Sequence, residues 1–221
     1  MIFAITDEEK VAARKGGISG FFVRTDTPGF SVPSVIPIMG HLGADTGIVH
    51  LDQLRVPDRQ RLGPLHNGLS VAMDGVNAGR LSMAGSCVGI ARWALNQALA
   101  YVKVRKTFGR LIAEHQAVQI MLAECAMDIY AVKSMLRHCA WLIDEGRSAT
   151  KEVSMAKACA TEMVSRVVDK AIQVHGAIGL TNELRLEEAY RWARVLRIPD
   201  GTAEIQRRTI ARRLLSGDTE I

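Results

Sequence analysis

Apolar residues recur at spacings of three and four along three stretches of the chain, which predicts three long amphipathic helices. The stripes cover 81–102, 118–143 and 153–174, and Ile143 is expected to end the second stripe on its buried face. Weaker patterns predict two shorter helices, at roughly 182–196 and 202–216. Three long helices and a split fourth, joined by short connections, predict an antiparallel four-helix bundle.

The first 65 residues follow a different pattern, with five of the six prolines and only short apolar runs. The runs 20–23 and 47–51 are strand candidates, and Thr27-Pro28-Gly29 between them is a turn signal. Arg55-Val56-Pro57 is interpreted as the end of a strand that leaves the sheet. Short strands of this kind make a poor core by themselves, so we expect a fragment of a larger sheet before the helices.

The charge balance is mildly basic, with a formal net charge of +5 and a sequence pI near 9.2. The densest cationic cluster lies near the C-terminus and consists of Arg207, Arg208, Arg212 and Arg213. We interpret it as a solvated helix face that complements the helix dipole, with a cofactor phosphate as the alternative partner. No recognised nucleic-acid motif accompanies it, so no nucleic-acid partner is expected.

Cysteine usage and the N-terminus bear on the cellular compartment. The cysteines lie far apart in apolar stretches, at Cys87, Cys125, Cys139 and Cys159. None has the spacing of a metal or redox motif, so we expect reduced thiols in a cytoplasmic protein and no metal site. The first ten residues, MIFAITDEEK, lack the features of a signal peptide, and no stretch is apolar enough over a sufficient length to predict a membrane span.

Two clusters of polar residues and glycines interrupt the long helical patterns. By itself, Arg105-Lys106-Thr107-Phe108-Gly109 is interpreted as a helix C-terminal cap, because basic residues precede a glycine. The alternative is a phosphate site, with Phe108 placed against a flat ring. Gln173-Val174-His175-Gly176 is likewise typical of a glycine cap with a structural or solvated histidine. The functional alternatives are a base at His175 and a ligand that approaches the glycine backbone closely.

A third cluster, Pro199-Asp200-Gly201-Thr202-Ala203-Glu204, lies at the start of the last expected helix. Local sequence favours a turn or a helix N-cap for Asp200. Thr202 is also a plausible N-cap, with Glu204 in the first turn. The functional alternative for Asp200 is a carboxylate base that faces a substrate.

Taken in order, these clusters and several further positions resemble the acyl-CoA dehydrogenase family over essentially the whole chain. The strand region contributes Thr27-Pro28-Gly29, Gly40, Val56-Pro57 and Leu62-Gly63. The helical region contributes Arg80, Arg105-Lys106-Thr107-Phe108-Gly109, Gln116, Gln173-Val174-His175-Gly176 and Gly201-Thr202-Ala203-Glu204-Ile205-Gln206. The combination is far more specific than any one of these motifs.

The resemblance implies a C-terminal part of the family fold, in which a helical domain, a β-barrel and a four-helix bundle follow one another. The expected fold class is mainly α, an antiparallel four-helix bundle preceded by a small partial β-barrel segment. Residues 1–65 would be part of the middle β-domain and residues 66–221 the C-terminal helical-bundle domain.

The family binds FAD, so the resemblance also assigns cofactor contacts. Arg105 and Phe108 match flavin contacts made to the cofactor of an adjacent subunit, and Gln173 and Gly176 match contacts to its adenosine-diphosphate half. Thr107 and Gln116 are further expected cofactor contacts. Thr202 and Glu204 match positions that line the flavin of the same subunit. A homo-oligomer, either a dimer or a tetramer, is implied.

The resemblance places the catalytic base at Asp200 and the substrate acyl-CoA beside Arg80, Asn77 and Gly201. Several residues depart from the usual family pattern. Asp200 stands where glutamate is common and is one methylene shorter. Gly79 stands at the alternative base position and cannot serve, and Asn77 replaces a common aspartate. Ala177 replaces a common glycine.

The resemblance therefore predicts an FAD-dependent oxidoreductase that introduces an α,β double bond into an acyl-CoA thioester. An electron-transfer flavoprotein or another acceptor would take up the electrons, in the cytoplasm or in the mitochondrial matrix of a eukaryote. The alternative is a non-catalytic assembly partner of a fuller acyl-CoA dehydrogenase subunit. That partner would keep the bundle for subunit contacts without a complete flavin pocket.

Overall fold

The computed structural model describes residues 1–40 and 43–220. Contacts within the chain divide it into two compact units. The first unit consists of Met1–Ile38 and Leu42–Ala78, and the second of Met39–His41 and Gly79–Ile221. Each unit has its own architecture, and the candidate site described below lies in the second. The predicted boundary between 65 and 66 stays a prediction.

The first unit contains two small antiparallel sheets. One sheet has the strand order β1 (Ile2–Ile5), β2 (Ile18–Phe21) and β5 (Arg61–Leu62). The other is a hairpin of β3 (Phe30–Ile36) and β4 (Thr46–Leu51). The short helix α1 (Glu8–Ala12) and the 3-10 turn η1 (Asp58–Gln60) complete the unit, together with the first residues of α2. No closed barrel forms among the described residues, which agrees with the expected sheet fragment.

The strand predictions were right in part. The candidate at 47–51 is confirmed as β4, and the turn at Thr27-Pro28-Gly29 is confirmed, with Gly29 at φ +91°. The candidate at 20–23 lies two residues too late. The interpretation of Arg55-Val56-Pro57 as a strand end is wrong, because this stretch is irregular and Pro57 is the N-cap of η1. Proline has no N–H to donate to a sheet, and its fixed φ suits the start of a turn.

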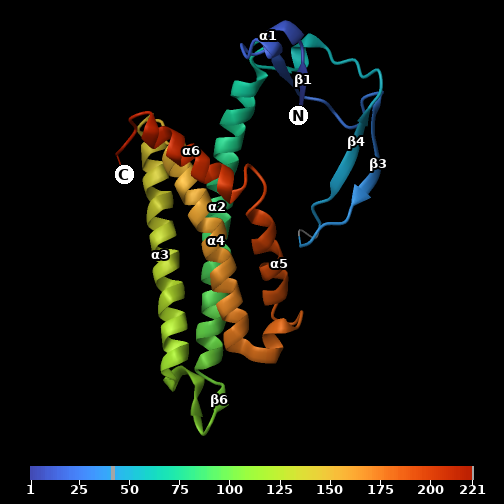
Figure 1. Ribbon diagram of the computed structural model, residues 1–221. Coiled ribbons are helices and arrows are strands. Elements are labelled where there is room, and N and C mark those ends of the chain that lie inside the picture. The colour runs from blue at the N-terminus through green and yellow to red at the C-terminus, as the bar shows by residue number, and fades with distance from the viewer. Residues whose placement is uncertain (41–42, 221) are drawn as a thin grey trace. The chain divides into compact units, whose positions relative to one another are not determined.

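The second unit is a helical bundle. It contains the larger part of α2 (Gly68–Val102) and four further helices. They are α3 (Gln116–Asp144), α4 (Thr150–His175), α5 (Leu186–Leu196) and α6 (Ala203–Leu215). In Figure 1, α3 and α4 lie side by side, and the shorter α5 and α6 form the split fourth position alongside α4. The turn η3 (Gly176–Leu180) follows α4 directly. The predicted fold class is therefore confirmed.

The bundle core is built from the three predicted stripes, with α4 the most deeply buried helix. Its stripe places Met163, Val164, Val167 and Val168 out of contact with solvent. Burying one such side chain stabilises the fold by about 1.5–3 kcal/mol. One stripe residue was assigned wrongly: Ile143 is exposed, and its neighbour Leu142 packs with Cys139 in a second small cluster.

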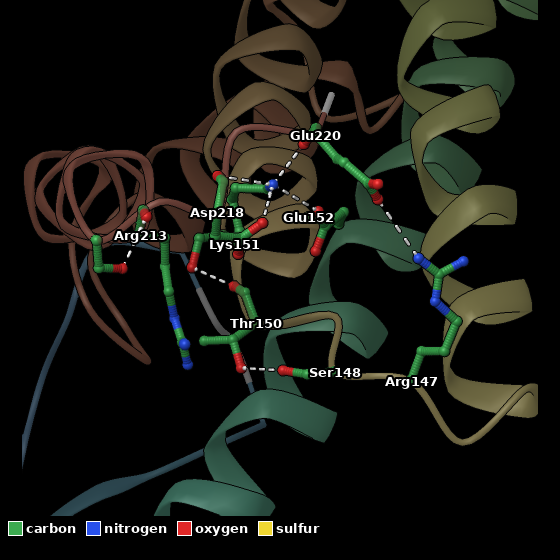
Figure 2. A network of polar contacts seen from close by, with 10 residues as sticks. Arg147, Ser148, Thr150, Lys151, Glu152, Arg213, Asp218 and Glu220 are labelled. Carbon is green, nitrogen blue, oxygen red and sulfur yellow. Dashed lines mark hydrogen bonds and ion pairs between the residues drawn. The ribbon is translucent and has the colours of Figure 1, made fainter.

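The C-terminal tail is held to the start of α4 by a buried lysine, as Figure 2 shows. Lys151 is only 1% exposed, and its ammonium donates to the Asp218 carboxylate at 2.5 Å. It also donates to the backbone carbonyls of Asp218 and Glu220 and lies 3.3 Å from the Glu152 carboxylate. The Asp218 carboxylate raises the pKa of Lys151, because the hydrogen bond favours the charged ammonium.

No helix among the described residues combines the length and the apolar character that a membrane crossing requires. The four cysteines carry free thiols, as expected. Burial raises the pKa of Cys87 to about 12 and that of Cys139 to about 11, because a thiolate is poorly solvated in an apolar core. These two side chains therefore act as small core residues.

Candidate functional site

The Asp200 loop (199–202) joins α5 to α6 and has an unusual backbone. Asp200 has φ +53° and Gly201 has φ +94°, so two consecutive residues lie in the left-handed region. Such a conformation is uncommon for a residue other than glycine and is found at functional sites when the surroundings impose it. The interpretation of Asp200 as a helix N-cap is wrong, whereas its alternative as an Asp-Gly turn is confirmed.

Thr202 is the N-cap of α6, as the sequence predicted. Its hydroxyl accepts a hydrogen bond from the backbone N–H of Ile205 at 3.4 Å. Glu204 lies in the first turn, where its carboxylate complements the positive end of the helix dipole. A side-chain hydrogen bond with Thr202 lowers the pKa of Glu204. With the cap supplied by Thr202, the Asp200 side chain is available for another role.

Three side chains from three helices clamp the carbonyls of this loop. Arg80 of α2 donates from Nε to the Asp200 carbonyl at 2.8 Å, and Lys157 of α4 donates to the Gly201 carbonyl at 2.8 Å. Gln206 of α6 donates to both carbonyls at 3.0 Å. All three side chains are buried. We call this set the carbonyl clamp, and it explains how two left-handed residues in succession are held in place.

Glycines on both sides of the clamp leave the room that the loop needs. A side chain at Gly201 would come within 2.9 Å of the Gln206 amide and 3.3 Å of the Arg80 guanidinium. A methyl group at Gly79 would come within 2.9 Å of an Asp200 carboxylate oxygen. The carboxylate of Asp200 therefore lies directly against the backbone of α2, one residue before Arg80.

The clamp places two buried cations near one carboxylate. Burial lowers the pKa of Lys157, and the Asp200 carboxylate opposes this change. Burial likewise lowers the pKa of Arg80, again opposed by Asp200. Desolvation disfavours a charged group, whereas a nearby opposite charge favours it. The Asp200 carboxylate therefore attracts both buried cations.

Arg105 to Gly109 lie in a β-hairpin, so the interpretation of this cluster as a helix cap is wrong. Helix α2 ends at Val102, and β6 (Lys106–Thr107) then pairs with β7 (Arg110–Leu111). Phe108 and Gly109 form the tip, with φ +52° and +83°. Two positive φ values in a two-residue tip match the mirror-image turns that hairpins favour. The Phe108 ring at this tip is 96% exposed.

The end of α4 lies beside the end of α2. The ring of His175 stacks on Tyr101 with centroids 4.5 Å apart, and its Nδ1 lies 2.7 Å from the Ala171 carbonyl. His175 is therefore structural, one of the two roles that the sequence suggested, and Gly176 caps α4 at φ +65°. Gln173 and Gly176 are both exposed at this end, and a side chain at Gly176 would meet nothing within 4 Å.

The predicted site residues therefore fall into two groups. Arg105, Thr107, Phe108, Gln116, Gln173 and Gly176 lie at what we call the hairpin end of the bundle, near β6 in Figure 1. Arg80, Asp200, Gly201, Thr202 and Glu204 gather around the Asp200 loop. About 33 Å of helix separates Arg80 from Val102. A single functional group of a ligand therefore cannot contact both sets of residues in the same chain. Asn77 is half-buried on α2, three residues before Arg80.

Sequence reasoning missed two members of the clamp, Lys157 and Gln206. Lys157 is 0% exposed, although a lysine is rarely buried completely without a partner. The available signal was its position, four residues after Val153 and three before Ala160, in phase with the apolar stripe of α4. Gln206 was noted as part of a motif, but nothing in the sequence showed which groups its amide would contact.

Comparison with known proteins identifies related chains. A family model of the acyl-CoA dehydrogenase C-terminal domain matches residues 66–215. A probable acyl-CoA dehydrogenase of Bacillus subtilis is 41% identical over 215 residues, which cover 97% of this chain and 56% of that protein. A subunit of the caffeyl-CoA reductase-Etf complex of Acetobacterium woodii is 38% identical, with the same coverage. The chain thus spans about half the length of these relatives.

Solved structures agree with these matches. Butyryl-CoA dehydrogenase from Megasphaera elsdenii superimposes with a TM-score of 0.91 at 30% identity, covering 96% of this chain and 55% of that one. A glutaryl-coenzyme A dehydrogenase in complex with glutaryl-CoA also gives a TM-score of 0.91, at 32% identity over 97% of this chain and 54% of that one.

Proposed function

The chain belongs to the acyl-CoA dehydrogenase family, and on this premise we propose that Asp200 is the catalytic base of an FAD-dependent oxidation of acyl-CoA thioesters. The observation that carries the proposal is the carboxylate of Asp200, which a strained and clamped loop holds against Gly79. A residue that served only as a turn would not need three buried donors from three helices.

The chemistry requires a carboxylate at a fixed position. The thioester carbonyl makes the α-hydrogen acidic, and the Asp200 carboxylate would take that hydrogen as a proton when the α-carbon–hydrogen bond breaks. When bound, FAD would supply the electron acceptor for the β-hydrogen, which leaves with its electron pair as the double bond forms. The thioester would thereby lose two electrons to the cofactor, and Asp200 would hold the α-proton.

The residues of the two groups fit FAD. At the hairpin end, exposed cations at Arg105, Lys106 and Arg110 lie within three residues of the exposed Phe108. Cations of this kind bind phosphates, and an exposed ring at a strained tip suits a flat partner. Near the Asp200 loop, Thr202 and Glu204 present polar groups at a helix start, and Asn77, Arg80 and Gly201 would face the acyl-CoA.

We also propose that the chain self-associates, because the hairpin-end residues would serve the flavin of an adjacent subunit. Apolar residues recur at helical spacing along the exposed side of α3, at Ile120, Met127, Tyr130 and Trp141. Exposed apolar residues on one side of a helix are typical of an interface. Sedimentation equilibrium at micromolar concentration should give a dimer or a tetramer, and a stable monomer would contradict the proposal.

Uptake of FAD is the experiment that tests the proposed function. The purified chain, incubated with excess FAD and freed of unbound cofactor, should retain the flavin absorption bands and lose them when acyl-CoA is added without oxygen. Electron-transfer flavoprotein or another acceptor should then restore the bands. A chain that retains no flavin, alone or after addition of FAD, would support the assembly-partner alternative instead.

A further inference from the structure

Lys157 is the least expected member of the carbonyl clamp. It lies at 0% exposure on the most buried helix of the bundle, and its ammonium donates to the Gly201 carbonyl at 2.8 Å. It forms no ion pair among the described residues, in contrast to Lys151 on the same helix. An ammonium without a direct carboxylate partner is costly to bury, so its position calls for an explanation.

The need to pair the Gly201 carbonyl does not explain this lysine. The Gly201 carbonyl already accepts a hydrogen bond from the Gln206 amide at 3.0 Å, so it would remain paired without Lys157. Replacing a buried charge by an apolar side chain of similar size is often neutral or stabilising, provided that no other charge loses its partner. The Asp200 carboxylate offsets part of the cost of burying this ammonium, and among the described residues the ammonium donates its hydrogen bond to the Asp200 loop.

The loop is where such a contact has an effect. Gly201 at φ +94° follows Asp200 at φ +53°, and the direction of the Asp200 side chain depends on both of these angles. Lys157 holds the Gly201 carbonyl, whereas Arg80 holds the Asp200 carbonyl. A fixed donor at each carbonyl leaves the two peptide planes little freedom to rotate, and a displacement of about 1 Å at a reacting group lowers rates severely.

We propose that Lys157 is a positioning residue for Asp200, which acts through the Gly201 carbonyl and does not touch the substrate. This inference rests on the proposed function of Asp200 for its catalytic consequence, although the effect on the loop can be measured without it. Lys157 holds the loop in the conformation in which the Asp200 carboxylate lies beside Gly79.

Lys151 provides a matched control on the same helix. It is also buried, at 1% exposure, and it also donates to backbone carbonyls, but these belong to the C-terminal tail (Figure 2). Lys157→Met and Lys151→Met therefore make the same chemical change in the same helix. Each variant keeps an unbranched side chain, one atom shorter than lysine, and removes the ammonium.

The first measurement is hydrogen–deuterium exchange of the unliganded chain, followed by mass spectrometry. Lys157→Met should speed exchange of the amides in 199–206 by about tenfold and leave the tail at 216–220 unchanged. Lys151→Met should speed exchange at 216–220 and leave 199–206 unchanged. Equal exchange at 199–206 in Lys157→Met and the unmodified chain would overturn the proposal, whether or not the chain is an enzyme.

The second measurement is the rate at which butyryl-CoA bleaches the flavin of the FAD-loaded chain. Lys157→Met should lower this rate about tenfold or more at saturation, with an undiminished isotope effect for α-deuterated butyryl-CoA and an unchanged half-saturating concentration. Lys151→Met should bleach at the unmodified rate. An unchanged rate in Lys157→Met would overturn the proposed positioning role.

Two further outcomes are distinguishable. If Lys157→Met does not fold, Lys157→Gln replaces the ammonium by a shorter neutral donor, and exchange at 199–206 should again rise. Unchanged exchange at 199–206 in Lys157→Gln would overturn the proposal. If the unmodified chain binds FAD but butyryl-CoA and longer acyl-CoAs do not bleach it, the proposed function fails, and the exchange measurement still decides how the loop is held.

Discussion

Replacing Asp200 by asparagine is expected to slow flavin bleaching by acyl-CoA about a hundredfold or more, while the fold and the flavin are retained. Asparagine has nearly the shape of aspartate and tolerates the left-handed region, so φ +53° should persist. The donors from Arg80 and Gln206 contact the backbone carbonyl at this position, and they remain. The amide cannot accept the α-proton.

Single-turnover bleaching of the FAD-loaded chain by a panel of acyl-CoAs is the measurement. Circular dichroism and the flavin spectrum serve as controls for folding and loading. Bleaching of Asp200→Asn at the unmodified rate would show that Asp200 is only a turn residue and that the base lies elsewhere. Residue 79 cannot supply that base, because it is glycine.

Asp200→Glu tests whether the site is built for the shorter acid. Glutamate in the left-handed region costs roughly 1–2 kcal/mol, more than aspartate does. The Asp200 carboxylate already lies against Gly79, so the longer side chain must extend past this contact. We therefore expect slower bleaching in Asp200→Glu than in the unmodified chain. An equal or faster rate would mean that the site merely tolerates aspartate.

The helical part of the fold was predictable because each long helix buries one continuous stripe. The stripes at 81–102 and 153–174 appear in the structure as the buried faces of α2 and α4. The error at Ile143 arose in the last turn of α3, where Leu142, one residue earlier, continues the buried face from Cys139. Near a helix end, a step of three and a step of four fit the periodic pattern equally well.

The strand region was harder to predict, because proline and short length hide the pairing. Strand β3 contains Pro33, which normally argues against a strand interior, and the register shifts between Ser31 and Ser34. Pro33 is tolerated within that irregularity. The hairpin at Lys106–Leu111 was hidden differently, because Arg and Lys before glycine also describe a helix cap. Only pairing between the strands decides that alternative.

The residues of the Asp200 loop could be singled out from the sequence, but the contacts around them could not. Asp200 and Thr202 follow from the local motif, whereas the contact between Arg80 and the Asp200 carbonyl joins residues 120 positions apart. Such a contact depends on how the helices pack, which a single sequence does not specify. Lys157 was detectable in principle, because a charged residue in phase with a buried stripe must find a polar partner inside the core.

Arg105→Ala is expected to weaken FAD binding by the oligomer roughly ten- to a hundredfold. A charge-assisted hydrogen bond to a phosphate contributes about 1.5–3 kcal/mol, and tenfold in affinity corresponds to about 1.4 kcal/mol. The side chain of Arg105 is exposed at the base of the hairpin. Its backbone carbonyl accepts from the N–H of Ile112 at 2.9 Å, a bond that alanine also makes. The hairpin should therefore survive.

Arg213→Ala is the matched control, because it removes the same side chain from the last turn of α6. Its guanidinium complements the helix dipole, so its loss should cost only a few tenths of a kcal/mol and leave FAD affinity unchanged. Fluorescence titration of the apoprotein with FAD measures both variants, and sedimentation confirms that each keeps the oligomeric state of the unmodified chain. Because the hairpin end would bind the flavin of an adjacent subunit, a variant that dissociates would lose FAD indirectly. Equal losses in the two variants, at equal oligomeric state, would remove the reason to place a flavin phosphate at Arg105.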